Sequence, residues 1–444
     1  MAVMFHDALL QKGVHRLEGT NLDYDALMRV IGNAHVVLLG EASHGTQEFY
    51  RERARITKRL IVEKGFTAIA VEADWPDAYR VHRYVSAQGH DSSAQDALAD
   101  FQRFPTWMWR NIEVQEFIEW LRTYNDDRRR DTQQVGFYGL DLYSLHASMQ
   151  AVLNYLEQAD RPAAARARAR YACFDHFGED SQSYGFATSY GLDESCEKEV
   201  VAQLVDLRRH AEDYLRRDGF VAEDAFFYAE QNARLVANAE RYYRAMFQGR
   251  VSSWNVRDRH MAETLHALIT HLRRRLPDPK LVIWEHNSHL GDARATEMSE
   301  RGEINVGQLV RERYGGDSVL IGFTTYEGTV TAASAWDGPT ERKRVLPALT
   351  DSYEAVLHDI AIPNFLLTWN DAHVRDVFNK RRLERAIGVI YAPETERLSH
   401  YFYATLPEQF DAILHFDRTQ AVPPLDLTHT FMENEPPETF PTGI

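Results

Sequence analysis

Cysteine is scarce in this sequence, with only Cys173 and Cys196 among 444 residues. Both lie in segments with a helical pattern, so neither a disulfide framework nor a thiolate metal site is expected. We expect two unreactive thiols in a reducing cytosol.

Long hydrophobic runs and an excess of positive charge are also missing. No stretch approaches the run of about 18 apolar residues that a membrane span needs, and the opening MAVMFHDALLQKG lacks the layout of a secretory signal. Lys and Arg number 50 against 66 Asp and Glu, which gives a formal net charge of −16. An acidic surface repels phosphate, so neither nucleic acid nor a membrane is expected as a partner. We expect a cytoplasmic protein that acts on a small molecule, and the sequence predicts no particular oligomeric state.

Fingerprints of several enzyme classes are absent as well. No GxGxxG follows a predicted strand and no GxxxxGK[ST] occurs, so the usual nucleotide-binding loops are not expected. The serine elbow GxSxG and the zinc motif HExxH are missing too. His286 and His289 remain as two imidazoles whose spacing suits a divalent metal.

The pattern of short apolar runs and helical segments indicates βα units. Predicted strands cover residues 35–40, 66–73, 133–141, 280–287, 317–326, 364–369, 385–391 and 410–416. A long segment between the third and fourth strands favours helix without a strict heptad, which argues against a coiled coil. We predict an α/β fold with a mainly parallel central sheet flanked by helices and a large helical insertion. The predicted parts are the α/β core in residues 1–144 and 277–425, the insertion in 145–276, and an irregular Pro-rich tail in 426–444.

Acids and histidines follow four of the predicted strands. In chain order they are Glu41 and His44, Glu72 and Asp74, Asp141, and Glu285 with His286 and His289. The carboxyl ends of parallel strands meet at one edge of a sheet, where open α/β folds bind ligands. An acid at a strand end is often only a helix cap or a solvated loop residue. Because the pattern recurs at four strands, we expect a functional cleft at this edge.

Two arginines fall on apolar faces of predicted helices. Arg53 shares a stripe with Phe49 and Ile56, so it faces the core and needs an anionic partner. Arg257 groups with Met261 at the start of a later helix. That position leaves open whether Arg257 pairs with the acids or reaches solvent.

An acid and imidazole cluster without a nucleophilic serine or cysteine suits a hydrolase that activates water. At this point the sequence resembles the erythromycin esterase family along nearly the whole chain. The matching blocks are LLGEASHGTQEFYRERA, VEADWPDAYRVHRY, TWMWRN, FYGLDLYS, SWNVRDRHMAETL, WEHNSHLGDARATEM, RAIGVIYAPETERLSHYF and LPEQFDAILHFD. The resemblance implies a hydrolase of the type that opens a macrolide lactone with water, on an α/β fold with extra helices. It leaves the natural substrate undefined, and its wider superfamily includes metal-dependent peptidases and a haem-binding group.

The resemblance also implies roles for matching residues. His44 of GEASHG matches the general-base histidine, which takes a proton from water. Glu41 and Glu72 match the supporting carboxylates, and Arg53 matches the buried arginine.

The pair His286 and His289 matches a second imidazole pair, expected to polarise the carbonyl or to protonate the leaving oxygen. The expected enzyme needs no cofactor. One alternative is a metallohydrolase that holds Zn²⁺ or Mn²⁺ with Glu41, His44, Glu72, His286 and His289. Another is a small-molecule-binding protein without turnover, in which Arg53 and Arg257 clamp an anion.

Several aromatic residues are candidates for the cleft wall beside Arg257. They are Trp75, Trp107, Trp109 and Tyr138. A large apolar substrate would pack on such residues, although core packing explains each of them equally well.

Overall fold

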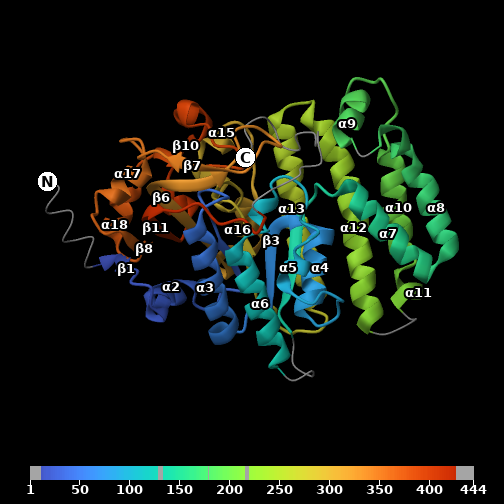
Figure 1. Cartoon of the computed structure of the whole chain (residues 1–444), viewed down its shortest axis with the longest axis horizontal. Helices are drawn as coiled ribbons and strands as arrows, with labels where there is room; N and C mark the ends of the chain where they lie inside the picture. Colours follow the sequence, from blue (N-terminus) through green and yellow to red (C-terminus); the bar gives the residue numbers. More distant parts are fainter. Residues whose placement is uncertain (1–11, 129–133, 179, 216–219, 427–444) are drawn as a thin grey trace.

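A nine-stranded sheet forms the centre of the molecule (Figure 1). The structure, a computed structural model, describes residues 12–128, 134–178, 180–215 and 220–426. The beginning of the predicted core, residues 1–11, and the predicted tail from residue 427 onward lie outside the described residues.

Six neighbouring strands of the sheet are parallel, which confirms the predicted α/β fold with a mainly parallel central sheet. In spatial order they are β11 (Ala412–Thr419), β6 (Ser318–Ala332), β2 (Val36–Leu39), β5 (Leu281–Trp284), β3 (Ala68–Asp74) and β4 (Gly136–Asp141). Three strands join antiparallel, namely β8 (Asn364–Thr368) next to β11, β1 (Val14–Arg16) next to β8, and β7 (Glu341–Val345) next to β6.

Both faces of the sheet are buried, as expected for parallel strands covered by helices. Along β2, Val36 and Leu38 face one apolar core, whereas Val37 and Leu39 face the other, because side chains alternate along a strand. On the second face pack α3 (Gln47–Lys64) and α6 (Ile112–Asp126). On the first face pack α13 (Arg250–Leu272) and α16 (Val306–Tyr314).

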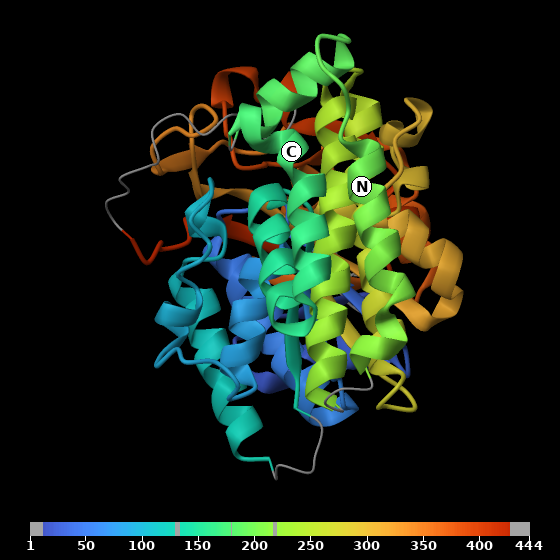
Figure 2. The ribbon, with the colours of Figure 1, turned by 90° about the vertical axis from the view of Figure 1, so that its right-hand side faces the viewer.

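The segment predicted as a helical insertion forms a layer of long helices beside the sheet (Figure 1), and Figure 2 looks onto it. Its helices are α7 (Leu145–Ala159), α8 (Arg161–Tyr171), α9 (Ser181–Ser189), α10 (Glu197–Arg209), α11 (Ala211–Leu215), α12 (Phe220–Met246) and α13. The longest, α12, packs against α7 and α13, and α13 carries the layer onto β4. Within the described ranges no helix combines the length and apolar character needed to cross a bilayer.

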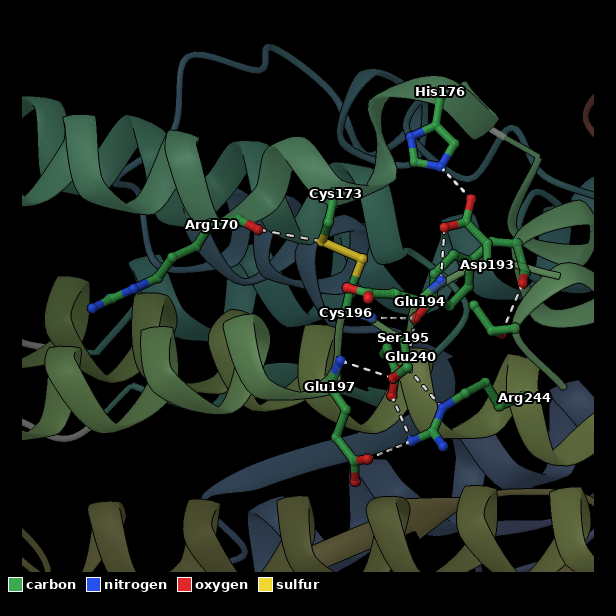
Figure 3. The surroundings of a disulfide bond; sticks show 12 residues. Arg170, Cys173, His176, Asp193, Glu194, Ser195, Cys196, Glu197, Glu240 and Arg244 are labelled. Carbon is green, nitrogen blue, oxygen red and sulfur yellow. Dashed lines mark hydrogen bonds and ion pairs between the residues drawn. A yellow bond between two sulfur atoms is a disulfide. The ribbon is translucent and has the colours of Figure 1, made fainter. Parts of the chain in front are cut away.

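A disulfide joins Cys173 and Cys196 inside this helical layer (Figure 3), so the expectation of two unpaired thiols is wrong. Cys173 lies in the short helix η3 (Ala172–Phe177), and Cys196 precedes α10. The packing of these two segments brings the Cα atoms to 6.0 Å, a separation that a disulfide spans. Helical patterning around each cysteine carries no information about this pairing. Because the two thiols are paired, they give no reason to expect a reducing compartment.

The predicted strand 385–391 is displaced. The observed strand β9 (Arg382–Arg385) pairs with β10 (Tyr401–Ala404) in a separate two-stranded sheet. Residues beyond β9 instead touch the loop after β2, where the His44 N–H donates to the carbonyl of Ile387 at 3.3 Å. This backbone hydrogen bond holds the loop in addition to its connection to β2.

The register of the strands brings the predicted site residues to one edge. Leu39 of β2 pairs with Trp284 of β5, Trp284 pairs with Val71 of β3, and Val71 pairs with Gly139 of β4. The residues after these four positions therefore project from the same end of the sheet.

Gly45 offers a test of how tightly the loop after β2 is held. A Cβ there would lie 1.8 Å from the carbonyl oxygen of Thr331, and the Gly45 carbonyl accepts N–H groups from Thr331 and Val422. We expect Gly45→Ala to lower the free energy of unfolding by about 1–3 kcal/mol, measured by urea denaturation. The matched control is Gly316→Ala, where nothing lies within 4 Å of a new Cβ. Equal stability of the two variants would contradict the tight packing.

Candidate active site

His44 is held by a carboxylate at the carboxyl end of β2. Its Nδ1 lies 2.9 Å from Glu41 Oε1, and the other carboxylate oxygen lies 2.7 Å from Arg53 Nη2. A carboxylate beside a guanidinium accepts, so we assign the His44 proton to Nδ1. The lone pair on Nε2 is then available as a base.

Arg53 is buried on α3, as the helical stripe predicted. Its guanidinium lies over the rings of Tyr50 and Trp284, at 4.5 and 5.1 Å from the ring centroids. The Tyr50 hydroxyl donates to the His44 carbonyl at 2.5 Å. Arg53 thus supplies the positive charge that keeps Glu41 in place.

A second buried arginine joins three elements of the site. Arg257, at 6% exposure on α13, binds Asp141 through Nε at 3.0 Å and through Nη2 at 2.6 Å. The same Nη2 lies 2.7 Å from Glu72 Oε1. Arg257 therefore pairs with the strand-end acids rather than reaching solvent.

Glu72 is fixed at both carboxylate oxygens, since Oε2 also accepts the His286 N–H at 2.8 Å. Burial alone would raise the pKa of Glu72, but the Arg257 guanidinium and the His286 backbone N–H hold it well below its ordinary value. Glu72 is consequently ionised across the physiological pH range.

The two later histidines lie behind this arrangement. Arg257 Nη1 lies 2.9 Å from His289 Nε2, and Nδ1 of the same ring lies 3.0 Å from Asp258. Arginine only donates, so His289 Nε2 accepts and Nδ1 carries the proton. His286 accepts the Ser288 N–H at Nδ1, which places its proton on Nε2.

His286 and His44 come together although 242 positions separate them in the chain. Their ring centroids are 4.8 Å apart. Burial and the facing His44 keep the pKa of His286 well below its ordinary value, so this ring is neutral.

A cleft with about 680 Å³ of empty space, part of it open to solvent, lies beside His44. Its ionisable lining consists of His44, Glu72, Asp74, Asp77, Arg103, Asp141 and Arg257. Its aromatic lining consists of Phe101, Phe104, Trp109, Tyr143 and Trp336. The cleft therefore joins an apolar wall to a charged floor, as small-molecule sites do.

Not all the predicted residues reach this cleft. Trp109 and Arg257 line it, whereas Trp75 and Tyr138 stack on each other in the core at 6.0 Å and Trp107 is buried in the other core. Glu41, Arg53, His286 and His289 lie behind the lining residues. Core packing therefore explains Trp75, Tyr138 and Trp107.

Sequence reasoning missed Asp258, which orients His289, and Tyr143, whose ring lies 4.9 Å from the Arg257 guanidinium carbon. Asp258 directly follows Arg257 on a helix with an apolar face. The adjacency of Arg257 and Asp258 was the signal in the sequence, because two successive charged residues on a helix with an apolar face need buried partners.

The metal-ligand set considered from the sequence does not fit this geometry. Both nitrogens of His289 and both carboxylate oxygens of Glu72 already have partners in the protein. Glu41 is divided between His44 and Arg53. In the described part of the chain, no group of three or more His, Cys, Asp or Glu residues is arranged to hold a metal ion.

Comparison with known proteins agrees with the resemblance found in the sequence. Residues 61–419 match the family model for erythromycin esterase. Erythromycin esterase type II from Escherichia coli is 24% identical over 326 residues, which cover 70% of this chain and 73% of that protein. A Bacillus cereus structure has a TM-score of 0.79 at 20% identity, covering 95% of this chain and 99% of the other. An erythromycin esterase mutant in its open conformation has a TM-score of 0.69 at 19% identity, covering 94% and 99%. These structures share the fold.

The protonation of the buried Glu285 tests the negative charges assigned to Glu72 and Asp258. It is 1% exposed and neither carboxyl oxygen has a hydrogen-bond partner within the described residues. Burial, together with the negative charges of Glu72 and Asp258, raises the pKa of Glu285 well above its ordinary value of 4.5. The folded protein therefore keeps a proton that the unfolded chain loses, and stability falls as pH rises above about 4.5.

We expect Glu285→Gln to remove this loss of stability at higher pH, because glutamine does not titrate. The free energy of unfolding of the variant should exceed that of the wild type by about 1 kcal/mol or more at pH 7.5, with the difference shrinking towards pH 4. Urea denaturation across this pH range measures it. The control is the exposed Glu300→Gln, where the Arg381 partner lowers the carboxyl pKa and the effect has the opposite sign. A pH-independent difference for Glu285→Gln would contradict the assignment.

Proposed function

Because this chain belongs to the erythromycin esterase family of hydrolases, we propose that it cleaves a carboxylic ester or lactone with a water molecule activated by His44. The hydrogen bond between His44 Nδ1 and Glu41 carries this proposal, since it leaves Nε2 as the basic nitrogen of a residue that lines the cleft. Among the described residues Nε2 itself has no hydrogen-bond partner.

The first step forms the tetrahedral intermediate. His44 Nε2 takes a proton from water while the water oxygen bonds to the carbonyl carbon, and the carbonyl π electrons move to its oxygen. Glu72 lies close enough to His44 for their charges to interact, so its carboxylate stabilises the imidazolium that results.

Arg257 is suited to stabilise the oxyanion. Of its five N–H groups, four are directed to Asp141, Glu72 and His289, and one remains on a side chain that lines the cleft. A positioned donor of this kind lowers the barrier to acyl transfer.

The second step releases the products. The intermediate collapses, the bond to the alcohol oxygen breaks, and the His44 imidazolium returns its proton to the departing alkoxide. The products are a carboxylic acid and an alcohol, or a hydroxy acid when the substrate is a lactone. Each proton that His44 takes is therefore given back within one turnover.

The aromatic wall favours a substrate with a sizeable apolar part. Erythromycin, named in the relatives, is one such ester to test. Because Glu41, Glu72 and His289 are already paired within the protein, only His44 and His286 of the candidate metal ligands keep a free ring nitrogen. We therefore propose that this hydrolysis requires no metal.

His44→Ala tests the proposal on any ester or lactone that the wild type hydrolyses. We expect kcat to fall by about 10²–10⁴ with little change in KM, because the base acts on water rather than on substrate binding. The control is His90→Ala at an exposed position. Unchanged turnover in a folded His44→Ala protein would contradict the role of His44, and activity lost with a metal on dialysis against a chelator would support the metallohydrolase instead.

A further inference from the structure

A second cavity is lined in part by Ser288, which lies between His286 and His289 in the sequence. It has about 560 Å³ of empty space, part of it open to solvent. Its walls come from the start of α13, from α14 (Asn287–Leu290), α15 (Glu297–Glu300) and α19 (Glu396–Ser399), and from β10. No described residue lines both this cavity and the cleft. The two are therefore separate sites.

A buried donor without a partner lines the second cavity. His400 is 2% exposed, and its Nε2 accepts the N–H of Ala392 at 3.1 Å, which places the ring proton on Nδ1. Burial lowers the pKa of His400 to about 4, so the ring is neutral at physiological pH. His400 Nδ1 makes no hydrogen bond of good geometry among the described residues, although the Ala386 backbone lies near enough to the ring to oppose the lowering of its pKa. A buried donor in this position favours a ligand that brings an acceptor to it.

The cavity also contains positive charge that the protein neutralises weakly. Arg250 lines it, and its Nε lies 3.5 Å from Glu303 Oε1, which is long for a charged hydrogen bond. Burial raises the pKa of Glu303, which further weakens this pair. Arg301, which also lines the cavity, forms an ion pair with Glu297 at 2.7 Å. A ligand carboxylate in this cavity would therefore find both Arg250 and His400 in its walls.

The remaining wall is apolar, and its Leu398 side chain is exposed to solvent. Met298 is buried, Phe402 is partly buried, and Leu398 is 87% exposed. An apolar ligand body in the cavity would contact Met298, Leu398 and Phe402, a gain that an inorganic anion cannot provide. The lining thus selects an organic acid over phosphate.

Two contacts connect the second cavity to the site histidines. Ser288 lines the cavity, and its Oγ lies 2.8 Å from His286 Nδ1. The Arg250 guanidinium lies over Trp254, whose ring stacks on His289 at a centroid distance of 4.4 Å. A molecule bound in the cavity would therefore touch the supports of both histidines.

We propose that this second cavity binds a small carboxylate with an apolar body, and that the bound acid reduces hydrolysis through Ser288. The effect on hydrolysis rests on the proposed function, whose products include an acid of this class. The binding of the carboxylate does not rest on the proposed function. The cavity would let accumulated product slow the enzyme from outside the cleft.

Hexanoate is a suitable probe, and isothermal titration calorimetry measures its Kd without any substrate. We expect one saturable site in the wild type and a Kd at least about tenfold weaker in Arg250→Gln and in Leu398→Glu. Leu398→Glu changes an exposed side chain, so it should fold normally. The matched control is Arg103→Gln in the cleft, which should leave this Kd unchanged.

The other outcomes contradict the inference. Binding that is unaltered in both cavity variants, binding lost in Arg103→Gln instead, or equal binding of neutral hexanol would each exclude an acid site in the second cavity.

Ser288→Ala separates binding from its effect. With a hydrolysed ester, hexanoate should lower wild-type kcat, whereas Ser288→Ala should bind hexanoate normally and show no such decrease. Inhibition that only raises KM in the wild type would contradict the coupling and indicate binding in the cleft. If no ester is hydrolysed, the proposed function fails while the calorimetric result still decides on the acid site.

Discussion

The buried guanidinium of Arg257 is the interaction on which the arrangement of the site depends. A charge taken out of water is costly unless it is paired and hydrogen-bonded. Asp141 at the end of β4 and Glu72 in β3 meet this need, and His289 accepts a further N–H. Because Arg257 belongs to α13, the same contacts fasten the helical layer to the edge of the sheet. The helices of the insertion therefore contribute a buried residue to the candidate site.

The protonation states of the site follow from the two buried arginines. Arg257 keeps Glu72 ionised and directs the His289 proton towards Asp258, whereas Arg53 holds the Glu41 carboxylate that receives the His44 proton. These pairs leave His44 with a basic nitrogen beside the cleft and with the Glu72 carboxylate nearby. That combination is what a general base acting on water requires.

The sequence predicted the parallel sheet and the convergence of the strand-end residues for a clear physical reason. Apolar runs such as 36–39 can only be buried on both faces when helices cover them, and a parallel sheet then aligns their carboxyl ends. The stripe containing Arg53 likewise predicted its burial. Features that depend on packing between distant segments could not be read in this way. The Cys173 to Cys196 disulfide, the short antiparallel strands β1, β7 and β10, and the burial of Trp75 and Tyr138 away from the cleft are of this kind.

The position of the proton on His44 tests the central claim most directly, because it depends on neither a known substrate nor a variant. Nitrogen-15 chemical shifts of the histidine rings at neutral pH distinguish the two neutral forms. The account predicts a protonated Nδ1 and an unprotonated Nε2 for His44. A proton on Nε2 with a bare Nδ1 would mean that Glu41 does not hold the ring as described, and would contradict the assignment of His44 as the base.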